Sequence, residues 1–475
     1  MDAGSMNFRG LLVISAISWF AGMLASQSHG LTIDWIPSAL DVATNLIFLF
    51  VMPYVLSSVL IGVHKAIEKR ILVDFIYRGF IVSLGVISVI GYLFVLPFCV
   101  VLFGSDAVVF DWFGSEFLRN LLAKTSDVLT INSAAAVSVS FWQDWSLPHN
   151  IFYTLANDQL SIALSCSILF SLGVGYYAVQ KKDLSLVDVY DAVCRASHIA
   201  LSRLIYLLPI FAFFSGYHIH GQLSHSFVIS DFLKALMILV GSGLLIISAI
   251  TLLSMIVITK RRSVFLKEML LINCGSLGSP SAYLFVPVVS DFLTKTIGIP
   301  RYRSDFLLPI SFLFFSFSIY LSCALLGLVV LSFYQVDIIS VPAIFLPFAA
   351  LFDSLWSSPL KIDLAINEFG DLISVLFNIH VQQFTELIVV FIPVIVVLAN
   401  LISVNTAVLI VLLVSKWSGD TLNTEELQTK EVLSSTVIVE LSWPLIILAL
   451  TIFCLATAVF MAVGYSVGVL GLAGG

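Results

Sequence analysis

Long apolar windows follow one another along the chain, separated by short polar or charged stretches. Several windows exceed the ~18 uncharged residues that indicate a membrane-spanning helix. The pattern predicts spanning helices at residues 10–26, 42–63, 79–103, 158–179, 198–217, 233–259, 305–333, 384–415 and 436–465. We therefore expect an all-α polytopic membrane protein.

The first window also fits a second interpretation. Residues 8–26 combine Arg9, an apolar run and small residues near Ala25, which is the pattern of a secretory signal. We expect a retained helix rather than a cleaved leader. The later topology is the same in both cases, because a cleaved chain would also begin outside the membrane.

One apolar segment, residues 264–300, is broken in its middle by a run of small and polar residues from Asn273 to Ser281. Its first arm, from Ser263 to Cys274, holds twelve residues. As a helix, this arm would be ~18 Å long and could not cross a hydrocarbon core of ~30 Å. The segment is therefore predicted to be a re-entrant hairpin.

Residues suited to a sharp turn occupy the middle of this segment. Gly275 and Gly278 permit the turn, and Ser279 followed by Pro280 forms a good N-cap and first-turn pair for a returning helix. A helix that starts inside the membrane presents free backbone N–H groups and a partial positive charge, which attract a carboxylate. A spanning helix kinked by glycine and proline is the alternative interpretation.

Positive charges favour the hairpin. With the amino terminus inside and the segment returning to its own side, 18 of the 22 Lys and Arg residues are cytoplasmic, and those left outside are Arg119, Lys124, Lys234 and Lys361. This bias agrees with the positive-inside rule. A full crossing would place Lys295, Arg301 and Arg303 outside and would invert every later loop.

A second interrupted segment lies at about residues 339–380. Its apolar first part holds one carboxylate, Asp353, and ends at Ser357, Ser358 and Pro359, which repeat the hydroxyl-then-proline pattern. By the same charge argument, this segment enters from the outside. Two hairpins of opposite orientation form an inverted repeat, which places a binding site near the centre of the bilayer.

The charges after this second tip leave an alternative open. Its returning part would carry Lys361, Asp363, Glu368 and Asp371. Ionised groups that face hydrocarbon are costly, so these side chains must line water or lie outside the membrane. A half-entering helix followed by an external loop fits as well as a true second hairpin.

Composition excludes a soluble protein. Of the residues, 60% are hydrophobic and 11% are charged, and the mean hydropathy is +1.08, whereas a soluble domain carries ~25% charged residues. The six cysteines have no paired spacing, so we expect no disulfide, metal site or resident cofactor. No basic patch suggests nucleic acid, and no catalytic motif suggests an enzyme. The partners expected are membrane lipid and a small-molecule solute.

Short motifs recur in order along residues 8–415. They lie at residues 52–58, 148–157, 208–209, 286–287, 297–300 and 306–309. Their order and spacing resemble the dicarboxylate/amino acid:cation symporter family, the glutamate and aspartate transporters. No single motif is decisive, and the resemblance depends on their co-linearity.

The resemblance implies a glutamate-transporter-like fold with about eight core spanning helices and two re-entrant hairpins. Residues 1–260 would hold helices one to six, and residues 261–415 would form the transport core. Residues 416–475 would be a cytoplasmic linker and an extra C-terminal helix at 436–465, which is not typical of the family. The resemblance also implies that the chain crosses the plasma (bacterial inner) membrane several times and assembles as a homotrimer.

Candidate site residues come from the two tips and from the last helix of the core. We expect substrate contacts at Ser279, Ser281, Ser357, Ser358 and Asn405, and weaker cation contacts at Ser316, Ser318 and Asp353. Each has a plain alternative. The serines could cap helices or bond to their own backbone, Asn405 could bond to a neighbouring helix, and Asp353 could lie near the outer interface.

The chain departs from the family where its ligands would lie. The family's Asn-Met-Asp-Gly-Thr motif aligns with residues 315–319, which lack it, and its substrate-binding Asp and Arg align with Leu398 and Leu401. A later cation-binding Asp of the family aligns near Leu409. The resemblance therefore supports the fold and class better than it supports acidic amino acids or sodium.

Together these features predict a secondary active transporter, a symporter. It would move a small anionic solute, such as a dicarboxylate or an acidic amino acid, coupled to a sodium or proton gradient. Two alternatives remain at this level. The chain could be a non-transporting membrane scaffold or sensor derived from the family, which would explain the missing cation motif, or an anion channel.

Overall fold

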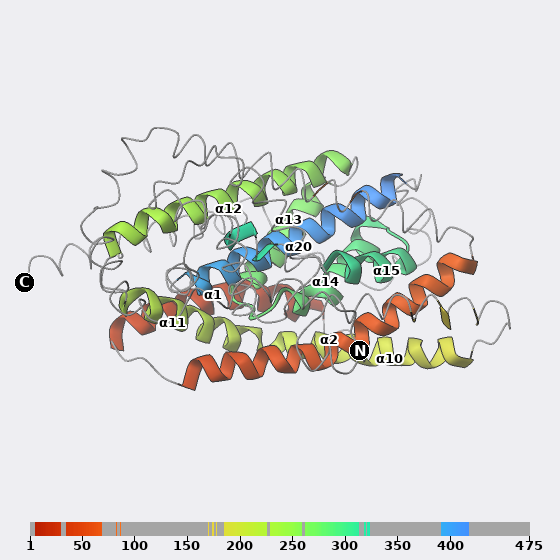
Figure 1. Ribbon diagram of the computed structural model, residues 1–475, viewed down its shortest axis with the longest axis horizontal. Helices are drawn as coiled ribbons and strands as arrows, with labels where there is room; N and C mark the ends of the chain where they lie inside the picture. Colours follow the sequence, from red (N-terminus) through yellow and green to blue (C-terminus); the bar gives the residue numbers. More distant parts are fainter. Residues whose placement is uncertain are drawn as a thin grey trace, which may run out of the picture.

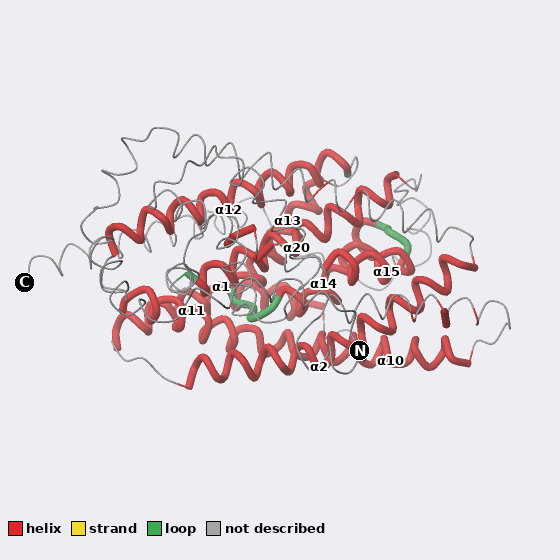
Figure 2. The backbone as a smooth tube through the Cα atoms, viewed as in Figure 1, coloured by secondary structure: helices red, strands yellow, loops and turns green. Residues whose placement is uncertain are grey.

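The computed structural model describes six stretches of the chain, with a few isolated residues between them. These are residues 5–29, 35–68, 185–225, 229–258, 262–312 and 391–417, together with 82, 86, 170, 173–174, 177, 318–319 and 321–323. All secondary structure in these stretches is helical, as Figure 2 shows. The predicted segments at 339–380 and 436–465 lie outside the described residues, and those at 79–103 and 158–179 do so almost entirely.

Most predicted apolar windows in the described stretches correspond to helices. These helices are α1 (Ser5–His29), α2 (Trp35–Glu68), α12 (Ile229–Val257) and α20 (Ile392–Trp417). Across the described residues, four helical stretches are long and apolar enough to cross a membrane: Ser38–Glu68, Val187–His218, Leu239–Val257 and Val394–Trp417. The helical, apolar character predicted from the sequence is thus confirmed.

The helix predicted at 198–217 is longer than expected. It begins with α10 (Ser185–Leu204), passes through the short 3-10 turn η2 (Ile205–Leu207) and continues as α11 (Leu208–His225). The first part of α10 carries Asp188, Asp191 and Arg195 three to four residues apart, so its apolar residues form only one face. A search for continuous apolar windows therefore misses this part.

Helix α20 runs through the middle of the molecule (Figure 1). It packs against α12, against α13 (Arg262–Leu277) and against α15 (Arg301–Phe312). From Val394 to Trp417, 94% of its most apolar window is buried inside the protein. From Ile392 to Ser415 the helix carries no charge, so its enclosed polar side chains can face only protein or an enclosed site.

Helices α1 and α11 approach each other closely through two glycines. A Cβ on Gly22 would collide with the carbonyl oxygen of Phe213, and a Cβ on Gly216 would collide with that of Trp19. The two backbones are therefore in direct contact at this crossing. Small residues allow this type of packing between helices in membranes.

Residues 262–297 form a helix, a tip and a returning arm. The returning arm consists of a 3-10 turn, η3 (Ala282–Phe285), the short helix α14 (Val286–Asp291) and a π-helical turn, η4 (Phe292–Ile297). The ring of Phe265, near the start of α13, lies 5.7 Å from the ring of Phe292 in the returning arm. The chain thus reverses direction within this segment.

The details of the turn differ from the prediction. Helix α13 continues through Gly275 to Leu277, so the first arm is longer than expected. Gly275 is not part of the turn, because it lies within this helix. It serves packing instead, since a Cβ there would meet the side chains of Leu12 and Phe285. Gly278 lies at the turn, against Ala212. The glycines therefore serve close packing as well as chain reversal.

Candidate functional site

The tip of the hairpin is closed by its own serines. Ser279 and Ser281 are 1% and 2% exposed. The hydroxyl of Ser279 donates to the carbonyl of Ser281 at 2.7 Å, and Ser281 Oγ accepts from the backbone N–H of Tyr283 at 3.4 Å. Ser281, in an extended conformation, is therefore the N-cap of the returning arm. The prediction that Ser279 and Pro280 form the cap is wrong by two residues.

A side chain of α20 reaches this tip. Asn400 is fully buried, and its Nδ2 donates to the carbonyl oxygen of Ser279 at 2.8 Å. Its Oδ1 has no hydrogen-bond partner among the residues described. Sequence reasoning missed Asn400, although an amide inside a long apolar helix is a signal in itself.

Asn405 lies on another face of α20, about 140° around the helix from Asn400 at 3.6 residues per turn. Its Nδ2 donates to Asn273 Oδ1 at 2.8 Å and to the Leu401 carbonyl at 2.7 Å. Its Oδ1 accepts from the hydroxyl of Thr251 at 3.2 Å. The structure thus brings Asn405 to the first arm of the hairpin rather than to the tip serines, and both N–H groups of the amide already have acceptors.

The predicted cation ligands are described only in part. Ser403 of α20 donates to the hydroxyl of Ser318 at 2.8 Å. Ser316, Asp353, Ser357 and Ser358 lie outside the described residues. No group of three or more His, Cys, Asp or Glu side chains in the described stretches could hold a metal ion.

Apolar side chains occupy the positions where the resemblance implies charged ligands. Leu398, Leu401 and Leu409 are all buried. Leu398 packs against Gly243 of α12, where a Cβ would lie 2.6 Å from its Cδ2. From Ile392 to Ser415, α20 carries no charged residue. The polarity available along α20 therefore comes from amides and hydroxyls.

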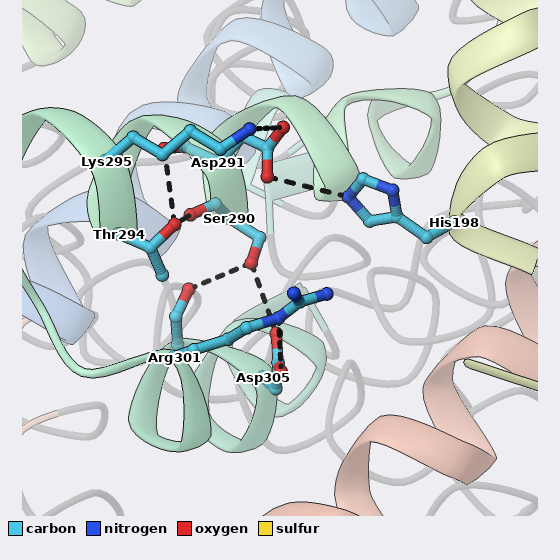
Figure 3. Close-up of polar contacts among 8 residues, drawn as sticks. His198, Ser290, Asp291, Thr294, Lys295, Arg301 and Asp305 are labelled. Carbon is cyan, nitrogen blue, oxygen red and sulfur yellow. Dashed lines mark hydrogen bonds and ion pairs between the residues drawn. The ribbon is translucent and has the colours of Figure 1, made fainter. Parts of the chain in front are cut away.

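A polar cluster lies at the base of the hairpin, away from the tip (Figure 3). Its buried part joins α14 to α15. The Ser290 hydroxyl donates to the Asp305 carboxylate at 3.2 Å, and the Ser304 hydroxyl donates to Ser290 Oγ at 3.2 Å. Arg301, which is exposed, lies 3.4 Å from the same carboxylate. Asp305 is thus surrounded by donors from two elements.

The outer part of the cluster joins the hairpin to α10. Asp291 pairs with Lys295 at 2.9 Å, one turn along the same arm. On its other side, the Asp291 carboxylate lies 3.8 Å from Nε2 of His198 in α10, as Figure 3 shows. The sequence indicates on which side of the membrane Lys295 and Arg301 lie. Each of these cations lies four residues from its carboxylate, a spacing that the sequence also contains. The contacts of Asp291 with His198 and of Asp305 with Ser290 arise only from the fold.

Comparison with known proteins gives one family. The model of the sodium:dicarboxylate symporter family matches residues 11–352 of the chain. The match includes α1, α2 and the hairpin, and it ends before α20. No curated protein matches the chain.

Proposed function

Because the chain belongs to the sodium:dicarboxylate symporter family, we propose that it is a secondary active transporter. It moves a small anionic solute, a dicarboxylate or an acidic amino acid, across the membrane. A sodium or proton gradient drives this movement. The observation that carries the proposal is the family match, since it extends over the helical hairpin as well as over the apolar helices before it.

In this proposal the hairpin is re-entrant. Helix α13 has 16 residues, or ~24 Å of helix, which is less than a hydrocarbon core of ~30 Å. The contact between Phe265 and Phe292 supports the placement of both ends on one side. Arg262 lies at one end and Lys295 at the other, and positive charge at both ends supports a cytoplasmic position for both.

The solute carboxylate binds between the two tips, at Ser279 and Ser281 on one side and at residues 357–359 on the other. The buried tip and its contact with α20 support this placement. The Ser279 hydroxyl already donates to Ser281, so a carboxylate would take over that donor. In the absence of solute, the Ser281 carbonyl accepts the hydrogen bond of the Ser279 hydroxyl, so the tip can close without leaving that hydroxyl unpaired.

The coupling ion would bind at Ser316, Ser318 and Asp353, without the acidic residue that the resemblance implies near Leu409. The hydroxyls of Ser318 and Ser403, 2.8 Å apart, provide two neutral oxygens between α20 and the segment after α15. This set is weak for sodium and has no carboxylate to carry a proton.

The moving unit would comprise α12 to α15 and α20, and α1, α2, α10 and α11 would form the static scaffold of a homotrimer in the plasma membrane. This division follows the family resemblance. Its boundary passes through the contact of His198 with Asp291 and through that of Gly62 with Phe306. Both contacts would have to break when the unit moves.

Uptake by the purified chain in proteoliposomes tests the proposal. Labelled dicarboxylates, acidic amino acids and neutral amino acids are offered while sodium and proton gradients are imposed separately. We expect saturable uptake of at least one anionic solute that stops when one of the gradients is dissipated. Unitary conductance with no saturation would indicate an anion channel, and no uptake of any solute would indicate a scaffold or sensor.

A further inference from the structure

The Asn400 amide is held in one orientation at the hairpin tip. The Ser279 carbonyl oxygen that it contacts at 2.8 Å accepts hydrogen bonds and cannot donate them. The amide nitrogen must therefore face Ser279, because the flipped amide would bring two acceptors together. This contact fixes the direction of Oδ1 as well, since both atoms belong to one planar group.

That oxygen is an acceptor with no donor. Asn400 is 0% exposed, and Oδ1 has no hydrogen-bond partner within the described part of the chain. Most buried polar atoms in proteins are paired, so an unpaired amide oxygen requires an explanation. The same amide contacts Ser279 through its nitrogen, and Ser279 is one of the two serines to which we assign the solute carboxylate.

Other buried polar atoms of α20 do not share these properties. Asn405 uses its amide on Asn273 and Thr251, and Ser403 donates to Ser318. Thr406 Oγ1 and Ser415 Oγ also lack partners in the described stretches, but no contact brings either of them to the hairpin tip. Asn400 is thus the residue that combines contact with the tip and a free acceptor.

We infer that Asn400 Oδ1 accepts a hydrogen bond from the solute, so that the solute carries a hydroxyl or ammonium donor beside its carboxylate. This inference rests on the proposed transport function. It narrows the class of transported solute to carboxylates that also carry a hydrogen-bond donor. An ionised carboxylate has no donor, so a plain dicarboxylate would leave Oδ1 unpaired. A site built to accept a hydrogen bond from its substrate discriminates against an analogue without that donor by as much as ~10⁴–10⁵-fold.

Binding of three probes of equal chain length tests the inference. Succinate, malate and aspartate differ at one carbon, which bears hydrogen, hydroxyl or ammonium. With the purified full chain in detergent, titration calorimetry should give malate or aspartate a Kd at least ~100-fold below that of succinate. The Asn400→Leu variant, similar in shape and without polar atoms, should bind all three alike.

Thr406→Val is the matched control. It removes another buried, unpartnered oxygen from the same helix with little change in shape, and it should keep the preference of the wild type. If Asn400→Leu does not fold, the comparison of the three probes on the wild type still decides the matter.

Several results would overturn the inference. These are equal affinity of the wild type for the three probes, no binding of any of them, or a preference that survives in Asn400→Leu. Sodium that raises the Tm without solute, in the wild type but not in Asn400→Leu, would make Oδ1 a cation ligand instead.

Uptake is scored separately in proteoliposomes. Selective binding without uptake would refute transport and leave the Asn400 contact intact. Uptake of succinate as fast as that of malate and aspartate would refute the contact and leave transport intact.

Discussion

Asn405 of α20 and Asn273 of α13 form a side-chain hydrogen bond of 2.8 Å, from Nδ2 to Oδ1, inside the helical core. The hydroxyl of Thr251 in α12 completes the group by donating to Asn405 Oδ1. Three helices are thus connected at one amide. This geometry makes a structural role for Asn405 directly testable against the substrate role predicted from the sequence.

Replacing Asn405 with Leu should destabilise the protein by about 1–3 kcal/mol, because it leaves the side-chain oxygen of Asn273 without its hydrogen-bond donor. The double-mutant cycle of Asn405→Leu with Asn273→Leu should give a coupling of about 0.6 kcal/mol, up to about 1.7 kcal/mol. Unfolding in mixed detergent micelles measures both values. Strictly additive effects of the two changes would contradict a functional hydrogen bond between them.

The hairpin should depend on the pair Phe265 and Phe292, whose ring centroids are 5.7 Å apart. Phe265→Ala is expected to cost about 3–5 kcal/mol, because Phe265 is fully buried. The aromatic pair itself should show a coupling of about 0.5–1.5 kcal/mol in a double-mutant cycle. The neighbouring Val264 is 38% exposed, so Val264→Ala serves as the control and should cost much less.

The crossing of α1 and α11 should tolerate no side chain at its two glycines. Gly22→Ala and Gly216→Ala should each destabilise the protein by about 1–3 kcal/mol, because each added methyl group collides with a backbone carbonyl. Within the described part of the chain, a Cβ on Gly10 of α1 would meet no neighbouring heavy atom within 4 Å. Gly10→Ala should therefore be neutral or stabilising, and equal losses at all three sites would refute the close crossing.

The proposed movement of the hairpin relative to α10 should be blocked by a cross-link between them. In a variant lacking the six native cysteines, His198→Cys and Asp291→Cys would replace two side chains whose ends, Nε2 and Oδ1, lie 3.8 Å apart. Cross-linking this pair with mercury should stop uptake, and a thiol reductant should restore it. The control pair, Asp291→Cys with Lys295→Cys, lies within one arm, and its cross-link should leave uptake intact.

The apolar helices could be predicted from the sequence, because the length of an apolar window is a local property of the chain. Windows near α1, α2, α12 and α20 predicted helices that the structure contains. The start of α10 was not predicted, because its apolar residues form only one face and charged residues interrupt the apolar window. The structure has a break between two arms, but it begins at Gly278 rather than at Asn273, since α13 continues as a helix to Leu277.

The candidate site depended on contacts that no local pattern contains. The sequence favoured Asn405 as the polar residue of the last core helix, whereas the amide that reaches the tip belongs to Asn400. Which face of α20 meets the tip is decided by the packing of α12, α13 and α15 around it. Likewise, the pairing of Ser290 with Asp305 arises from the fold of the returning arm and could not be read from spacing.

The central claim is that the tip serines bind a solute which a cation gradient drives across the membrane. Initial rates of uptake into proteoliposomes, for the wild type and for a variant with Ser279→Ala and Ser281→Ala, test it most directly. Each lost hydrogen bond is worth about 1 kcal/mol, so the double change should lower kcat/KM at least about tenfold. Ser248→Ala is the control, since this exposed hydroxyl bonds only to its own helix. We predict that the double change at the tip reduces gradient-driven uptake and that the control change leaves it intact. Equal uptake by all three proteins would contradict the account.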